Sequence, residues 1–153
     1  MYTKEQASSI RQAFWKAFGQ YMALEVSAEG LKINWINYKT GIKYLSFKMQ
    51  ADNATACMMI ELSHPDEGLR ELMFDQFEAL KAMLDGHLNE DWLWERDTFD
   101  EQGKAVARIR TCLDKVNIFR QEDWPALISF FKPRMRALDA FWSEAQYGFD
   151  LFR

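Results

Sequence analysis

Lys39, Thr40 and Gly41 form a cluster whose residue types could bind a phosphate. A P-loop combines a lysine, a hydroxyl and glycines for that purpose, and its backbone amides curl round the anion. It needs two glycines ahead of the Lys-Ser/Thr pair. Here there is one glycine and it comes last. The order therefore favours a tight turn, with Gly41 at positive φ, over a phosphate cradle.

Cations could also bind a phosphate, because charge is unevenly distributed along this chain of net charge −4. Residues 30–51 carry four lysines and no acid, residues 61–101 carry thirteen acids and three bases, and residues 104–136 carry eight bases and three acids. If the two basic segments meet in one sheet, their fields would add. The candidate binding residues are Lys39, Lys43, Lys48, Lys104, Arg108 and Arg110.

The ligand of such a surface is open at this point. It could be nucleic acid, or a small anion held near Lys39 and Arg110. Residues two apart on a strand share a face, so Arg108 and Arg110 would point to the same side of the sheet. Alternatively, the bases pair with acids of the following helix and the face is merely solvated. The acidity of the whole chain argues against strong non-specific DNA binding.

Trp92, Trp94 and Arg96 alternate along a predicted strand and would share one of its faces. If no helix covers that face, the three residues form a partner surface, because Trp and Arg dominate interface energetics. If a helix does cover it, the two indoles belong to the core.

Cys57 and Cys112 are far apart in the sequence and lack Cys-x-x-Cys spacing. We expect both to be buried thiols in a reducing compartment, and a disulfide between them is the less favoured alternative. His64 and His87 are not at ligand spacing, so the sequence predicts no zinc site, and we expect no cofactor. No serine or cysteine has a recognisable catalytic partner, so acyl transfer has no support.

Apolar periodicity predicts three helices that would position these residues. A capping box that starts at Thr3 precedes a helix over 4–26. A second helix carries an apolar stripe over 69–84, and a third begins near Glu122. Pro133 should kink the third helix, because the proline ring clashes with the preceding turn.

Strand formers predict three strands at 31–37, 42–50 and 56–62, the last two paired antiparallel. A second hairpin follows over 92–96 and 107–113. The order α-β-β-β-α-β-β-α predicts an α+β fold, in which a mainly antiparallel sheet packs against three helices.

The composition is that of a folded globular protein, with 48% hydrophobic residues, seven glycines and three prolines among 153 residues. We expect a single domain over 1–153. No apolar run approaches the roughly 20 residues of a membrane span, and the start lacks a signal peptide, so we expect a cytoplasmic protein without a membrane partner. The apolar tail 149–152 either docks on the domain or enters a second subunit, which leaves a homo-oligomer open.

Four runs of sequence are distinctive: INWINYKTGIKYLSFKMQADN, MIEL, DWLWE and VNIFRQEDWPALISFFKPRMRALDAFW. Across nearly the whole chain they resemble a bacterial family of domains of unknown function. The resemblance implies domains that stand alone or lie C-terminal to a part that looks like a restriction nuclease. It therefore implies a setting of nucleic-acid processing or defence and assigns no chemistry.

That setting makes a metal-dependent nuclease the alternative function. A restriction-type core needs an Asp and a Glu-x-Lys set on adjacent strands to hold a divalent metal and orient water. Asp52 and Glu61 could supply the carboxylates, with Lys48 or Lys39 as the lysine. Glu61 lacks a lysine at the required step, however, and Asp52 lies at a hairpin tip, so we expect Glu61 to pair with a base or cap the next helix.

The sequence thus predicts a non-catalytic interaction module or a nucleic-acid-associated module, with a protein or a nucleic acid as its partner. It predicts no catalytic residues and no metal ligands outside the nuclease alternative.

Overall fold

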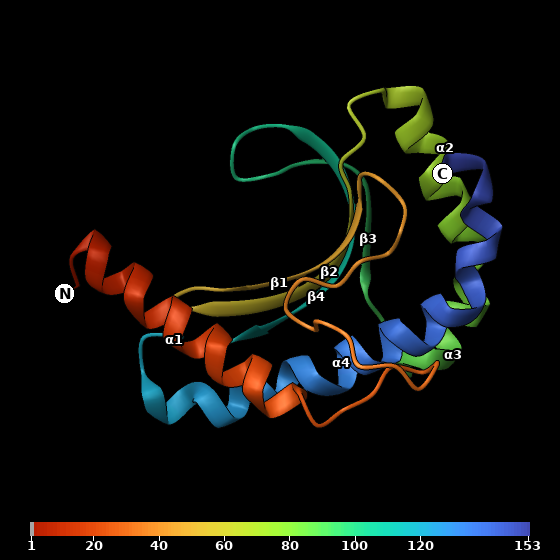
Figure 1. Ribbon diagram of the computed structural model, residues 1–153. Coiled ribbons are helices and arrows are strands. Elements are labelled where there is room, and N and C mark those ends of the chain that lie inside the picture. Colours follow the sequence, from red (N-terminus) through yellow and green to blue (C-terminus); the bar gives the residue numbers. More distant parts are fainter. Residues whose placement is uncertain (1) are drawn as a thin grey trace.

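The computed structural model describes residues 2–153, in which four α-helices accompany one four-stranded antiparallel sheet (Figure 1). The α+β class is confirmed. The helices are α1 (Lys4–Met22), α2 (Glu67–Ala79), α3 (Lys81–Leu88) and α4 (Trp124–Ala145). The strands are β1 (Leu45–Ala51), β2 (Thr55–Leu62), β3 (Leu93–Phe99) and β4 (Ala105–Asp114), and two short 3-10 helices are η1 (Gln121–Asp123) and η2 (Gln146–Phe152).

The strands lie in the order β1-β2-β4-β3, and each neighbouring pair is antiparallel. Side chains alternate between the two faces of a strand, so one face of the sheet joins the hydrophobic core and the other does not. Residues on the core face include Phe47, Met58, Ile60, Leu62, Ala107 and Ile109.

The sheet is strongly curved, and α2, α3 and α4 lie on its convex side (Figure 1). The β3–β4 hairpin curls back over the concave side, which no helix covers in this view. A register shift in the β3–β4 pairing between Glu95 and Thr98 accompanies this bend, since a bulge bends the strand that contains it. Helix α1 packs on α4 through rings such as Phe18 and Phe131, whose centroids are 6.0 Å apart.

The predicted strand over 31–37 is absent, so the predicted α-β-β-β-α-β-β-α order is wrong in this part. The Asn34 side chain accepts hydrogen bonds from the amides of Ile36 and Asn37 at 3.0 and 3.1 Å. Such a local turn satisfies amides that a strand would have used in its ladder. The segment therefore runs without regular structure between α1 and β1.

The predicted helix over 69–84 is two helices, α2 and α3, which meet at Leu80. The first helix ends at Met22, four residues before the predicted end at Val26. Pro133 lies inside α4. Within residues 2–153, no helix is long and apolar enough to cross a membrane.

The apolar tail docks on its own chain. Phe149 of η2 is fully buried, and its ring lies 4.8 Å from that of Phe77 in α2 and 5.1 Å from that of Trp142 in α4. Of the two alternatives for the tail, the first is therefore the one observed.

The prediction of two separate buried thiols is wrong, because Cys57 and Cys112 form a disulfide. Cys57 in β2 lies directly opposite Cys112 in β4, with Cα atoms 4.1 Å apart. Both face the concave side of the sheet, and Cys112 is exposed there. The β2–β4 pairing that brings the two together is non-local, and sequence spacing does not reveal it.

Candidate functional site

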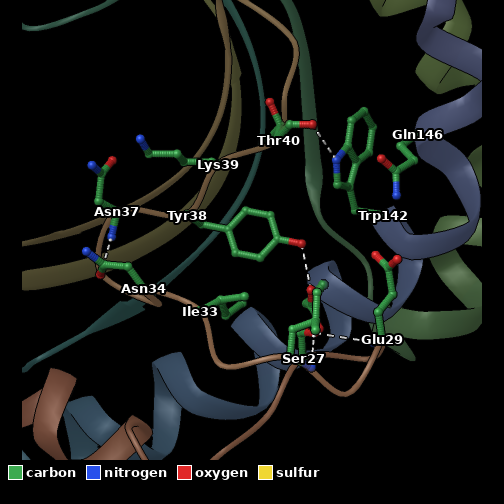
Figure 2. A pocket seen from close by; sticks show the side chains of 12 residues that line it. Ser27, Glu29, Ile33, Asn34, Asn37, Tyr38, Lys39, Thr40, Trp142 and Gln146 are labelled. Atoms are coloured by element: carbon green, nitrogen blue, oxygen red, sulfur yellow. Dashed lines mark hydrogen bonds between the residues drawn. The ribbon is translucent and has the colours of Figure 1, made fainter.

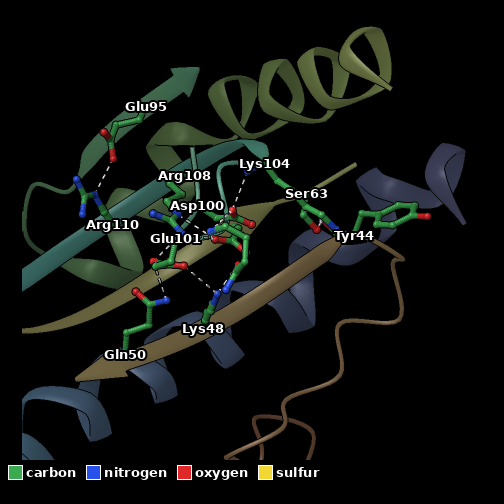
Figure 3. A network of polar contacts seen from close by, with 12 residues as sticks. Tyr44, Lys48, Gln50, Ser63, Glu95, Asp100, Glu101, Lys104, Arg108 and Arg110 are labelled. Atoms are coloured by element: carbon green, nitrogen blue, oxygen red, sulfur yellow. Dashed lines mark hydrogen bonds and ion pairs between the residues drawn. The ribbon is translucent and has the colours of Figure 1, made fainter. Parts of the chain in front are cut away.

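A network of ion pairs on the concave face gathers several of the predicted cations (Figure 3). Arg108 donates from Nε to Glu61 Oε2 at 2.9 Å, and its Nη2 lies 2.8 Å from the same oxygen. Lys48 Nζ lies 3.7 Å from Glu61 Oε1. Glu61 and Arg108 are each only 6% exposed. The expectation that Glu61 pairs with a base is thus confirmed.

Glu101 joins this network from the tip of the β3–β4 hairpin. Its carboxylate lies 3.3 Å from Arg108 Nη2 and 4.0 Å from Lys48 Nζ, and it accepts a hydrogen bond from Gln50 Nε2 at 3.1 Å. Its own backbone amide lowers the pKa of Glu101 below the usual value, helped by Gln50 and the two bases, although burial acts in the other direction. The curled hairpin is therefore held to β1 across the concave face.

Strand register explains why these residues meet. Ser46, Glu61, Arg108 and Glu95 are successive partners across β1, β2, β4 and β3. Because this face is opposite the core, polar side chains can gather there. Met59 and Val106 also point to this side, and they are buried although they lie outside the core cluster. Among the influences on Arg108, burial would lower its pKa, but Glu61 and Glu101 raise it.

The ion pairs neutralise three of the six predicted cations. Besides Lys48 and Arg108, Arg110 Nε lies 2.6 Å from Glu95 Oε1. The acids come from the sheet and the hairpin tip, and not from the following helix as the alternative supposed. The acids of α2 pair instead with Arg96, which contacts Asp75 and Glu78. Lys48, Arg108 and Arg110 are thus balanced by the three carboxylates of Glu61, Glu101 and Glu95.

The other three cations lie outside this network. Lys43 Nζ lies over the Tyr44 ring at 5.1 Å, and Lys104 lies in the hairpin turn, where its amide donates to Asp100. Lys39 lines a pocket of the 27–40 segment. Lys39, Lys43 and Lys104 form no ion pair within residues 2–153.

Trp92 and Trp94 do not form an exposed patch. Trp92 precedes β3 and is buried, with its Nε1 donating to Glu90 at 2.7 Å. The Trp94 ring packs against the Phe74 ring of α2, with centroids 5.7 Å apart. The Arg96 guanidinium lies 4.7 Å from the centroid of the Phe74 ring. Helix α2 therefore covers the face of β3 that carries Trp94 and Arg96. Since a helix covers this face, the indoles pack with the core and do not form a partner surface.

The three residues of the nuclease alternative are only partly brought together. Lys48 is close to Glu61, but Asp52 lies in the β1–β2 turn at the other end of β2. Glu61 lies six positions after Thr55 along β2, which corresponds to about 20 Å. No single ion could contact both carboxylates across that distance.

Asp52 has a structural role in its turn. It accepts hydrogen bonds from the amides of Ala54 and Thr55, both at 2.8 Å. Burial would raise the pKa of Asp52, but these hydrogen bonds outweigh it and hold the pKa below its usual value. Elsewhere in residues 2–153, three carboxylates approach within 4.8 Å at Glu67, Glu71 and Asp97, all of them exposed.

A pocket of about 290 Å³ lies between the 27–40 segment and the C-terminal part of α4 (Figure 2). We call it the Tyr38 pocket. Tyr38 and Trp142 supply aromatic walls, and Glu29 and Gln146 lie on the side of Trp142. The remaining lining residues are Ser27, Leu31, Ile33, Asn34, Asn37, Lys39, Thr40 and Asp139.

Asp139 and Trp142 hold the irregular segment against α4. The Asp139 carboxylate accepts from the Tyr38 hydroxyl at 2.6 Å and from the Ala28 amide at 2.7 Å. Trp142 Nε1 donates to the Thr40 carbonyl at 2.9 Å. Burial raises the pKa of Tyr38, and the hydrogen bond to the Asp139 carboxylate raises it further. The tyrosine is therefore a neutral donor at physiological pH.

The Lys39-Thr40-Gly41 stretch bends at Gly41 into the turn before β1, and the Thr40 hydroxyl is already used within the chain. Thr40 Oγ1 is 2.9 Å from the Leu45 carbonyl and 3.2 Å from the Ile42 amide. Gly41 has φ +81, the left-handed conformation that favours glycine.

The Tyr38 pocket escaped prediction because its two halves are 101 residues apart in the sequence. One signal for it was available. Asp139 lies four residues after Met135 on the apolar stripe of α4, which also contains Leu138 and Trp142. Within α4, it is the one acidic residue on this buried face. A carboxylate in that position needs donors from elsewhere in the fold.

The fold defines an α+β protein with one antiparallel sheet, helices on one face and a polar network on the other. The chain belongs to the family described as a domain of unknown function, DUF4268, whose model matches residues 10–146. No curated protein and no solved structure shows a significant match to the chain.

Proposed function

We propose that the protein is a non-catalytic module that binds a partner protein through residues 21–40. The observation that carries this proposal is the concentration of exposed apolar side chains between residues 21 and 36. They are Tyr21, Leu24, Val26, Leu31 and Ile36, and Leu24 is 93% exposed. Single exposed apolar residues are ordinary, but a group of them typically marks a contact surface.

The same segment is suited to present these side chains. It has no regular structure after α1, yet Asp139 and Trp142 hold it in place on α4. A surface that is fixed before binding loses less conformational entropy when a partner arrives. Of these apolar residues, Leu31 also lines the Tyr38 pocket.

Charge favours a protein partner over nucleic acid. The cations nearest to a sheet-based phosphate surface, Lys48, Arg108 and Arg110, already have carboxylate partners. Phosphate contacts would have to displace those carboxylates, and the chain as a whole carries a net charge of −4.

Site-specific photo-cross-linking in native cells tests the location of the surface. A photoreactive amino acid replaces Leu24 or Leu31, and the matched control replaces Leu151 of η2, which is 84% exposed but distant in the sequence. We expect one protein to be cross-linked from positions 24 and 31 and not from 151.

Binding of the purified partner then gives the decisive comparison. Leu31→Asp should weaken binding at least tenfold, about 1.4 kcal/mol, whereas Leu151→Asp should leave it unchanged. Equal effects of the two substitutions would overturn the proposal. If the cross-linked protein is a second copy of this chain, light scattering should show a dimer that Leu31→Asp dissociates, and the partner protein proposed here would be replaced by self-association.

A further inference from the structure

We propose that the Tyr38 pocket binds an organic cation, namely the ammonium or guanidinium group of a lysine or arginine side chain presented by the partner. This inference rests on the proposed function and adds the chemistry of the contact. It comes from the charges, the aromatic walls and the size of the pocket.

Two carboxylates of the pocket lack a cation of their own. Asp139 is 6% exposed, and neither it nor Glu29 forms an ion pair within residues 2–153. Asp139 has two hydrogen-bond donors, but a carboxylate can accept about four hydrogen bonds. A buried anion without a cation is costly, so a cationic ligand would offset part of that cost.

The nearby bases of the chain do not fill this role. Figure 2 shows Lys39 extending away from the Tyr38 hydroxyl. Arg136, one turn before Asp139, pairs with Glu25 at 3.9 Å. Arg153 reaches the rim, where it lies 3.5 Å from Gln146 Oε1, but its ion pair is with Asp150 at 2.7 Å.

The walls suit a cation as well. Figure 2 shows the Tyr38 hydroxyl pointing toward the side of the pocket where Trp142, Glu29 and Gln146 lie. Aromatic faces attract ammonium and guanidinium groups, most strongly where the site is desolvated. The hydrogen bonds to Asp139 and Thr40 fix both rings in advance, so little rotamer entropy is lost on binding.

The size of the pocket indicates a side chain rather than a larger ligand. Its volume of about 290 Å³ is at the lower limit of pockets that bind small molecules, roughly 300 Å³. A lysine or arginine side chain that extends from a partner surface would fit, with Leu31 and the other apolar residues of 21–36 contacting the flanking surface.

The test is an NMR titration of the purified protein, followed at the Trp142 indole N–H. The probes are Nα-acetyl-arginine methylamide and Nα-acetyl-lysine methylamide, with the neutral citrulline and norleucine analogues as controls. We expect dissociation constants on the order of 1 mM for the cations and no saturable shift with the neutral analogues.

Three substitutions determine whether the site is the one proposed. Glu29→Gln should weaken cation binding at least fivefold, whereas Glu144→Gln, an exposed acid elsewhere on α4, should have no effect. Lys39→Ala should strengthen cation binding, because it removes a like charge from the lining. Asp139→Asn should abolish binding, and its melting temperature shows whether the fold persists.

Other outcomes would overturn the inference. Inorganic phosphate that binds more tightly than the cations, and is lost in Lys39→Ala, would make this an anion site. If cadaverine or agmatine binds tenfold more tightly than the blocked amino acids, the ligand is a free polyamine and not a side chain of a partner protein. Absence of cation binding together with cross-linking at positions 24 and 31 would refute this inference and leave the proposed function standing.

Discussion

The Arg108–Glu61 pair should act as a single structural unit, and replacing one partner should cost far more than breaking a similar pair nearby. Arg108→Met removes the guanidinium and keeps the bulk of the side chain. Glu61 would then retain only Lys48, whose Nζ lies 3.7 Å away and is partly exposed. Arg110→Met is the matched control, because Arg110 occupies the same face of the same strand and pairs with Glu95 at 2.6 Å.

Burial sets the difference in magnitude. The side chains of Arg108 and Glu61 are 7% and 8% exposed, whereas those of Arg110 and Glu95 are 32% and 22% exposed. Removing one member of a buried pair costs about 3–5 kcal/mol, because the other charge stays buried. Lys48 compensates in part, so we expect about 3 kcal/mol for Arg108→Met. A partly exposed pair contributes about 1 kcal/mol or less, which is the expectation for Arg110→Met.

Urea unfolding at pH 7 measures both effects, provided that the m-value is unchanged. In the double-mutant cycle, Glu61→Gln combined with Arg108→Met should cost at least about 1.5 kcal/mol less than the sum of the single changes, since the pair is in direct contact. Additive effects, or equal costs for Arg108→Met and Arg110→Met, would refute the structural role. A rise in melting temperature with Mg²⁺ that Glu61→Gln abolishes would show instead that Glu61 binds a metal.

Four further outcomes follow from the same contacts. Plasmid incubated with the protein and Mg²⁺ or Mn²⁺ should stay intact, because Asp52 and Glu61 lie at opposite ends of β2; cleavage that disappears in Glu61→Ala would contradict this. Gly41→Ala should destabilise the fold by about 1–2 kcal/mol because Gly41 has φ +81, whereas Gly86→Ala, in open space within α3, should stabilise it by up to about 1 kcal/mol; thermal melts compare the two. Dithiothreitol should lower the free energy of unfolding by about 2–4 kcal/mol, because the bond between Cys57 and Cys112 closes a long loop, and the Cys57→Ser variant should not respond. The pKa of Asp52 is below its usual value in the folded protein, so its carboxylate contributes fully to the free energy of unfolding above about pH 4, and this contribution is lost as the pH falls through the folded pKa. Asp52→Asn should therefore lose less stability than the wild type between pH 7 and pH 3, as measured by urea unfolding.

The elements that could be predicted are those whose signals are local. The capping box is present, with Thr3 Oγ1 accepting from the Gln6 amide at 3.1 Å, and both antiparallel hairpins lie where alternation predicts them. The failure at 31–37 is local too. The strand-forming residues there favour an extended backbone, but the Asn34 side chain stabilises a turn instead. β-propensity alone does not produce a strand where no partner strand is available. No proline or glycine marks the break between α2 and α3 at Leu80.

The site depended on non-local pairing, which the sequence does not encode in any short window. The cations of the two basic segments do approach one another, as Lys48 and Arg108 show, but Glu61 and Glu101 come with them. Charge counted along the chain therefore differs from charge on a surface. The disulfide and the Tyr38–Asp139 hydrogen bond likewise join residues 55 and 101 positions apart.

Hydrogen exchange of the complex with the cross-linked partner tests the central claim most directly, because it locates the bound surface on the backbone. Apart from those of Ile36 and Asn37, which donate to the Asn34 side chain, the amides of residues 32–40 form no hydrogen bond within residues 2–153 and should exchange quickly in the free protein. We predict that the partner slows exchange throughout 21–40 and leaves β1, β2 and β4 unchanged. Added protection confined to those strands, with exchange in 21–40 unchanged from that of the free protein, would place the partner on the concave face and contradict the account.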